Sequence, residues 1–200
     1  MRIDHVIYAS GDLSSTVRRF EKEYGLEAGG GGVHPRLGTR NSLVPVGGRQ
    51  YIELMAVAEP GASFLAVGVA EVLTTGERPF AVSIEPDDLD ATASRLGLQI
   101  TEGERRSTSG RVLRWRSAGL REAAGPSHLP FFVDWGDSDP DLPSLNSDVD
   151  GVAWMELGGD EDHVRRWLGD GRELPLRFSD GPTGPLALGL RRGSDIVVIR

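Results

Sequence analysis

The chain repeats one order of secondary structure, and this repeat constrains its fold more than any single motif. The first copy begins with an apolar strand at Ile3–Ala9, followed by an amphipathic helix at Leu13–Tyr24. Asp12 is suited to cap the start of that helix, and extended segments at Ser42–Val46 and Gln50–Val57 come later. The order predicts a βαβββ unit.

The same order begins again 76 residues further on, where Asp88-Leu89 takes the place of Asp12-Leu13. A strand at Phe80–Ile84 precedes a helix at Leu89–Leu96. Three extended segments follow: Gln99–Glu102, Arg111–Ser117 and Leu129–Trp135. Since an open βαβββ unit leaves one sheet face uncovered, pairing two of them is expected to bury that face.

A third and weaker copy runs from Val152–Leu157 through a helix at Asp160–Leu168 to three short extended segments. We therefore predict an α+β fold in which repeated βαβββ modules form a cupped mixed or antiparallel sheet with helices on the outside. A degenerate third module is expected at the C-terminus. The predicted divisions are a first module at 1–58, a helical linker at 59–78, a second module at 79–136, and a connecting loop with the third unit at 137–200.

Composition narrows the class of partner. A net charge of -8 and an isoelectric point near 5.0 argue against nucleic-acid binding, which needs clustered Lys and Arg. No stretch has the ~20 apolar residues of a membrane span, and no signal segment is recognisable. The chain has no cysteine, which excludes disulfides and thiolate chemistry. We expect a cytoplasmic protein that binds a small molecule.

One histidine and one glutamate lie inside buried-looking strands of the first copy. Alternation along a strand places His5 on the face of Ile3 and Ile7, and Glu53 on the face of Tyr51. If the strands are neighbours, a base, a carboxylate and an aromatic wall meet on the concave face. The pair could hold a divalent metal, act as a general acid and base, or form a buried hydrogen-bonded pair without an ion.

His34 and Asn41 flank a glycine-rich loop that leads into a strand. His34 is a candidate catalytic residue and Asn41 a candidate substrate ligand, since an amide both donates and accepts hydrogen bonds. The alternative is that both residues take part only in turns and local backbone contacts.

Further candidates for substrate binding lie in the second copy. Arg114 and Arg116 alternate with Leu113 and Trp115, so they either face the cup as a clamp for an anion or face solvent. The last strand adds Phe132 and Asp134 as candidate ligands, with Tyr51 from the first copy.

The chain resembles the vicinal oxygen chelate superfamily and, within it, the glyoxalase-like domain family. The resemblance rests on segments spread over residues 2–136. They are Asp4-His5-Val6-Ile7-Tyr8-Ala9 with Asp12-Leu13, Gly32-Val33-His34-Pro35 with Gly38-Thr39-Arg40-Asn41, Tyr51-Ile52-Glu53-Leu54, and Leu129-Pro130-Phe131-Phe132-Val133-Asp134-Trp135.

The resemblance implies paired βαβββ modules around a site in which His or Glu residues of the first and last strands hold a metal. His5 and Glu53 match the two positions of the first module, whereas Ala81 stands at the first position of the second. The implied cofactor is a divalent metal such as Mn, Fe, Ni, Co or Zn, or otherwise none.

Two functions follow as hypotheses. The first is a small-molecule enzyme with acid–base chemistry of the lyase or isomerase type, possible with or without a metal. The second is a protein that binds or sequesters a small molecule without turnover, as resistance proteins of the superfamily do. The chain is expected to be a homodimer by resemblance, or a monomer if the third unit covers a sheet edge.

Overall fold

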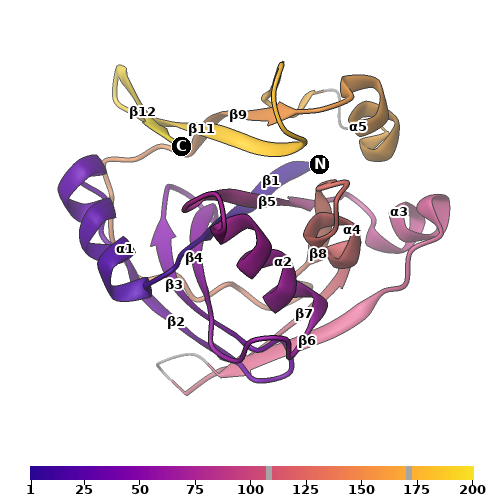
Figure 1. Ribbon diagram of the computed structural model, residues 1–200, viewed down its shortest axis with the longest axis horizontal. Coiled ribbons are helices and arrows are strands. Elements are labelled where there is room, and N and C mark those ends of the chain that lie inside the picture. Colours follow the sequence, from indigo (N-terminus) through magenta and orange to yellow (C-terminus); the bar gives the residue numbers. More distant parts are fainter. Residues whose placement is uncertain (107–109, 170–172) are drawn as a thin grey trace.

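The computed structural model describes residues 1–106, 110–169 and 173–200. In these ranges it has twelve strands, five α-helices and one π-helix, which confirms the predicted α+β class (Figure 1). The strands form one cupped sheet of eight and a second sheet of four.

The first half contributes four strands to the large sheet. Its elements are β1 (Arg2–Ala9), α1 (Leu13–Arg19), the π-helix η1 (Phe20–Tyr24), β2 (Gly29–His34), β3 (Thr39–Pro45) and β4 (Tyr51–Val57). The Asp12 carboxylate accepts a hydrogen bond from the Ser15 backbone N–H at 2.8 Å, and Gly25 ends the helix in the left-handed region. The helix predicted at Leu13–Tyr24 therefore forms, but its last turn is a π-helix.

The second half contributes the other four strands. Its elements are α2 (Phe64–Leu73), β5 (Arg78–Glu85), α3 (Leu89–Leu96), β6 (Thr101–Arg106), β7 (Val112–Ala118), α4 (Leu120–Ala124) and β8 (Phe131–Asp134). The strand order is β2-β3-β4-β1-β5-β8-β7-β6, so each half is a βαβββ unit in which the first and last strands pair in parallel. The halves join through β1 and β5, which are antiparallel. The edge strands β2 and β6 approach each other and nearly close the cup.

The helices take two different places. The apolar sides of α1 and α3 pack on the outer face of the cup, whereas α2 and α4 cover one end of it (Figure 1). A Cβ atom at Gly68 in α2 would lie 2.5 Å from the Ala124 carbonyl oxygen, so glycine is what lets the two helices approach. In the described part of the chain, no helix has the length and apolar character needed to cross a membrane.

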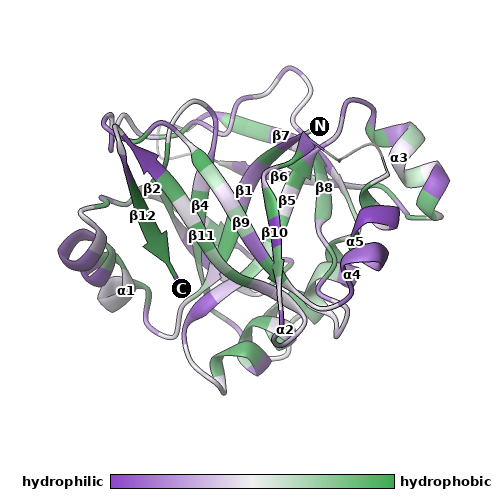
Figure 2. Cartoon of the chain, turned by 90° about the horizontal axis from the view of Figure 1, so that it is seen from above, coloured by the Kyte–Doolittle hydropathy of each residue, from purple (hydrophilic) through white to green (hydrophobic). Residues whose placement is uncertain are grey.

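The C-terminal elements form a second layer on the outer face of the cup (Figure 2). They are β9 (Val152–Gly158), α5 (Glu161–Leu168), β10 (Leu176–Ser179), β11 (Gly184–Arg192) and β12 (Asp195–Ile199), with strand order β10-β9-β11-β12. The predicted βαβββ order of elements is therefore present. Its pairing differs from that of the two halves, because β9 lies between β10 and β11 instead of beside the last strand.

The connection from β8 to β9 crosses the end of the cup opposite α2 and α4. Leu142 of this segment packs against Tyr51 and Leu113, which belong to the apolar cluster at that end. The Asn146 amide donates hydrogen bonds to the Glu27 and Pro45 carbonyl oxygens, at 2.8 and 3.0 Å. One end of the cup is thus covered by α2 and α4, and the other is crossed by the segment that leads to the C-terminal layer.

Candidate functional site

An irregularity in β1 shapes the floor of the cup. The pairing of β1 with β5 shifts between Ile3 and His5, so Asp4 is an extra residue in the strand. Ile3 therefore packs on the outer face with Val6, while His5 lines the cup. The prediction that Ile3 shares a face with His5 is wrong because strict alternation does not survive a bulge.

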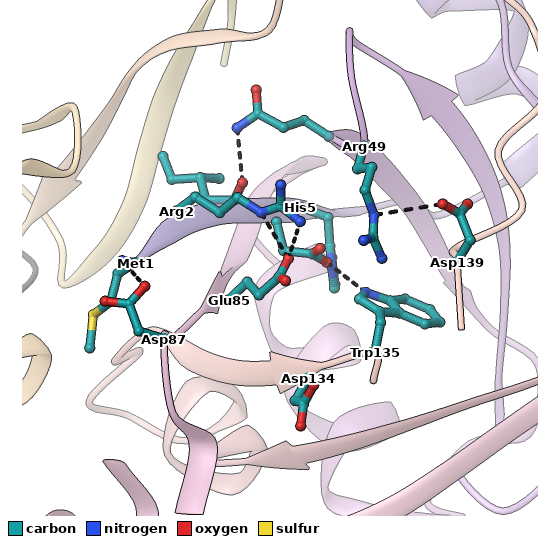
Figure 3. A network of polar contacts seen from close by, with 12 residues as sticks. Met1, Arg2, His5, Arg49, Glu85, Asp87, Asp134, Trp135 and Asp139 are labelled. Carbon is teal, nitrogen blue, oxygen red and sulfur yellow. Dashed lines mark hydrogen bonds and ion pairs between the residues drawn. The ribbon is translucent and has the colours of Figure 1, made fainter. Parts of the chain in front are cut away.

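The bulge places a carboxylate beside the imidazole. Asp4 Oδ2 lies 2.6 Å from His5 Nδ1, and both residues are buried. The Trp135 indole N–H points to the same oxygen at 3.4 Å, and Figure 3 shows the indole directed toward the region of His5. Hydrogen bonding to this carboxylate favours a proton on Nδ1, and Nε2 is the ring nitrogen that Asp4 does not contact.

The other nitrogen of His5 faces Glu53. The distance from Nε2 to Glu53 Oε2 is 3.5 Å, which is longer than a good hydrogen bond. The strands β1 and β4 are neighbours in the sheet, as the sequence argument assumed. Two proton acceptors therefore face the same small space from adjacent strands.

Asn41 fixes the second oxygen of Glu53. Its Nδ2 donates to Glu53 Oε1 at 2.5 Å, while its Oδ1 accepts from the Gly32 backbone N–H at 2.7 Å. Gly31 has a φ of +85°, and a Cβ there would lie 2.4 Å from the Asn41 carbonyl oxygen. The glycine-rich strand thus lets the backbone close over Asn41. Asn41 orients the carboxylate in this geometry and also lines the cavity, so the substrate contact predicted for it stays a prediction.

The remaining first-half candidates also line the cavity. His34 lies where β2 turns into β3, and its Nδ1 is 3.1 Å from the Thr39 hydroxyl. The Tyr51 ring stacks on the His5 ring, with centroids 4.6 Å apart and planes 17° apart. Burial raises the pKa of Tyr51 well above its ordinary value, and the Asp4 and Glu53 carboxylates raise it further. Its hydroxyl therefore keeps its proton and remains a donor.

The cavity between these residues has a volume of about 80 Å³ and is partly open to solvent. Its other walls come from the second half of the sheet and were not predicted as ligands: Arg105, Trp115, Ser117, Phe131, Val133 and Trp135. The alternation of Leu113, Trp115 and Ser117 was the available signal for one of these walls.

Four predicted ligands lie outside the cavity. Phe132 packs in the core and stacks on Trp167, with ring centroids 6.2 Å apart. Arg116 faces outward and binds Asp134 at 2.7 Å, and this ion pair lowers the pKa of the aspartate. Arg114 is exposed beside Glu104. The residues of β8 that face the cavity are Phe131, Val133 and Trp135, and Figure 3 shows Asp134 pointing away from His5.

The donor set at the floor does not form a metal site. In the ranges that the structure covers, no group of three or more His, Asp or Glu side chains is placed to hold an ion. His5 Nε2 and Glu53 Oε2 are two possible ligands, but Asp4 is turned to the opposite side of the ring. Ala81 and Phe131 cannot supply a donor from the second half. These residues do not fit a firmly held divalent metal, for which three or four protein ligands are usual.

Comparison with known proteins gives the family. The sequence model of the glyoxalase-like domain family matches residues 3–170, so the chain belongs to this family. This confirms the resemblance seen in the sequence. No curated protein sequence matches the chain significantly.

Solved structures support the fold. A hypothetical protein from Staphylococcus aureus aligns over 92% of this chain and 88% of its own, with 16% identity and a TM-score of 0.68. A variant of the Streptomyces coelicolor methylmalonyl-CoA epimerase, in complex with 2-nitronate-propionyl-CoA, aligns over 70% of this chain and 97% of its own. Its identity is 23% and its TM-score 0.50. At these identities the likeness concerns the fold alone.

Proposed function

We propose that the cavity catalyses proton transfer on a small, oxygen-bearing molecule, in a reaction of the isomerase or lyase type. One observation carries this proposal: His5 lies between two carboxylates at the floor of a cavity, with its free nitrogen facing Glu53. Membership of the glyoxalase-like domain family supports an enzyme-like role at the level of the superfamily.

The roles follow from the contacts. Asp4 holds Nδ1–H of His5, which leaves Nε2 as a basic atom directed into the cavity. Glu53 is the second proton acceptor, and Asn41 keeps its other oxygen occupied. A substrate C–H group beside a carbonyl would give its proton to one of the two groups, and the negative charge that develops on the carbonyl oxygen would need a donor. His34 is the nearby candidate.

Both proton-transfer groups lie on one wall, because β1 and β4 are adjacent strands. This arrangement favours movement of a proton between neighbouring substrate atoms, or its loss in an elimination. Inversion at a single carbon would require acid and base on opposite faces. We therefore propose tautomerisation or elimination instead of epimerisation.

The test is deuterium exchange in heavy water, followed by NMR on a panel of 2-oxo acids, 3-oxo acids and 1,2-diketones. The wild type is expected to accelerate exchange at the carbon beside a carbonyl group in at least one compound. Glu53→Gln and His5→Gln should each slow that exchange by about 100-fold or more, the usual contribution of a general acid or base. His163→Gln, at an exposed position on α5, is the matched control and should have no effect.

The contrary outcome is a wild type that binds compounds of the panel and exchanges none of them. It would favour the second function, a protein that sequesters its ligand. The aromatic walls from Trp115, Phe131 and Trp135 are the observation that supports this alternative, since they suit binding without chemistry.

A further inference from the structure

One wall of the cavity carries a cation that has no carboxylate partner among the residues that the structure describes. Arg105 on β6 is the only Lys or Arg among the described cavity residues. Its Nη2 donates to the Pro140 carbonyl oxygen at 2.6 Å, and it forms no ion pair with an acidic side chain in the ranges described. Partly buried charges in proteins are normally paired, so this guanidinium calls for an anion from elsewhere.

A neutral donor lies in the same part of the cavity. Arg105 and Tyr51 both line the cavity, and the positive charge of Arg105 has a lowering effect on the pKa of Tyr51 that is the smallest of those acting on it. The Tyr51 hydroxyl makes no hydrogen bond to another residue of the described ranges, although the ring is packed against His5. A guanidinium fork and a phenolic O–H are thus both available on the side of the cavity next to the connecting segment.

Two tryptophans extend this wall with apolar surface. Trp115 and Trp135 have ring centroids 5.4 Å apart. A Cβ atom at Gly103 would lie 2.2 Å from the Trp115 ring, so that glycine lets the indole lie flat on β6. Trp115 and Trp135 line the same cavity as Arg105.

We infer that Arg105 and Tyr51 bind the carboxylate of a monoanionic substrate whose planar, apolar body lies against Trp115 and Trp135. This inference rests on the proposed function, because it assigns the substrate class of the same site. A single guanidinium and one hydroxyl match a carboxylate. A dianionic phosphate fits less well, since Asp4 and Glu53 already place two carboxylates at the floor.

The experiment compares benzoate, benzamide and phenyl phosphate by isothermal titration calorimetry on the intact protein, at low and at high salt. The wild type should bind benzoate about tenfold more tightly than benzamide, the advantage expected for a charge-assisted hydrogen-bonded pair. Arg105→Gln should reduce that ratio to about one, and Tyr51→Phe should reduce it partly. Arg114→Gln is the matched control, because it removes a charge from the exposed face of the neighbouring strand.

The failures of the two proposals are separable. Glu53→Gln should lose proton exchange yet retain benzoate binding, whereas Arg105→Gln should lose the preference for the anion. Circular dichroism and thermal unfolding show whether each variant is folded. The inference is overturned if the wild type does not prefer benzoate to benzamide, if Arg105→Gln keeps the preference, or if phenyl phosphate binds more tightly than benzoate.

Discussion

At the scale of single residues, the chemistry of the site depends on one extra residue in β1. The bulge at Asp4 turns two consecutive polar side chains toward the cavity side of the strand. The bulge also interrupts the regular backbone pairing of the strand. Beside it, the Gln50 side-chain amide donates a hydrogen bond to the Ile3 carbonyl oxygen at 2.9 Å. The Gln50 side-chain oxygen accepts from the Val152 backbone N–H at the same distance, so the bulge is held from the C-terminal layer.

His128, a residue outside the cavity, is expected to make the stability of the fold depend on pH. His128 has a φ of +44° and packs on Gly184 of β11. A Cβ atom added at Gly184 would lie 2.7 Å from the Cβ atom of His128. Burial lowers the pKa of His128; the Ala123 carbonyl and Glu71 act to raise it, and Arg78 adds to the lowering. The unfolded chain thus takes up a proton on this histidine more readily than the native state does. The stabilisation that comes from keeping His128 neutral is therefore fully present above the unfolded pKa of about 6.5. It should be lost as the pH falls through the lower, folded pKa.

Urea unfolding measured across this pH interval tests the assignment. His128→Gln should flatten the loss of stability below about pH 6.5, the ordinary histidine value. The exposed His163→Gln variant should keep the slope of the wild type. An unchanged slope in His128→Gln would show that another group is responsible.

Residue-level prediction from the sequence succeeded where a strand is regular. Alternation was enough to bring His5 and Glu53 together, because β1 beyond the bulge and β4 follow it. It could not reveal Asp4, whose position depends on the bulge. It also could not choose between Phe131 and Phe132, because two adjacent aromatic residues give no sign of which face is buried in the cup. Arg105 was missed because the segment around it was expected to end at Glu102.

At the scale of elements, the contact between α2 and α4 controls the covered end of the cup. The close approach at Gly68 brings α2 over Ile7 and Met55, which also belong to the cavity floor. The predicted elements of this region were incomplete. The linker helix was expected, but α4 was not, since Leu120–Ala124 is too short to show a helical period.

Substitution of Gly68 tests that contact. Gly68→Ala should lower the free energy of unfolding by about 1–3 kcal/mol, because the added methyl group overlaps the Ala124 carbonyl. Helix propensity alone would raise the free energy of unfolding by about 1 kcal/mol. A net decrease would therefore be due to the steric overlap with the Ala124 carbonyl. Val67→Ala, at an exposed position of the same helix, should change stability by less than about 0.5 kcal/mol. Greater stability for Gly68→Ala in urea unfolding would contradict the predicted contact.

At the scale of the whole molecule, the two sheets share one core. Ile52, Leu54 and Ile84 of the cup lie in the same buried cluster as Met155 and Leu188 of the C-terminal layer. Repetition in the sequence predicted the third βαβββ-like unit. It could not predict how β9 pairs, because the strands of this unit are short and their order in the sheet depends on packing against β5.

A cavity in that shared core should weaken both layers together. Leu188→Ala is expected to lower the free energy of unfolding by about 2–5 kcal/mol, the range for buried leucines. Circular dichroism and tryptophan fluorescence should still report one coincident urea transition. Arg191→Ala, at an exposed position of the same strand β11, serves as the control with little loss. Two separated transitions would mean that the layers unfold independently.

The layer of β9–β12 on the outer face also has a consequence for biosynthesis. A ribosome that has made the first 150 residues has produced every strand of the cup, but Ile52, Leu54, Val82 and Ile84 still lack their covering sheet. Until translation reaches Ile199, the nascent chain presents this apolar surface to its surroundings. Holding chaperones, or rapid translation of residues 152–199, would then decide the yield of folded product.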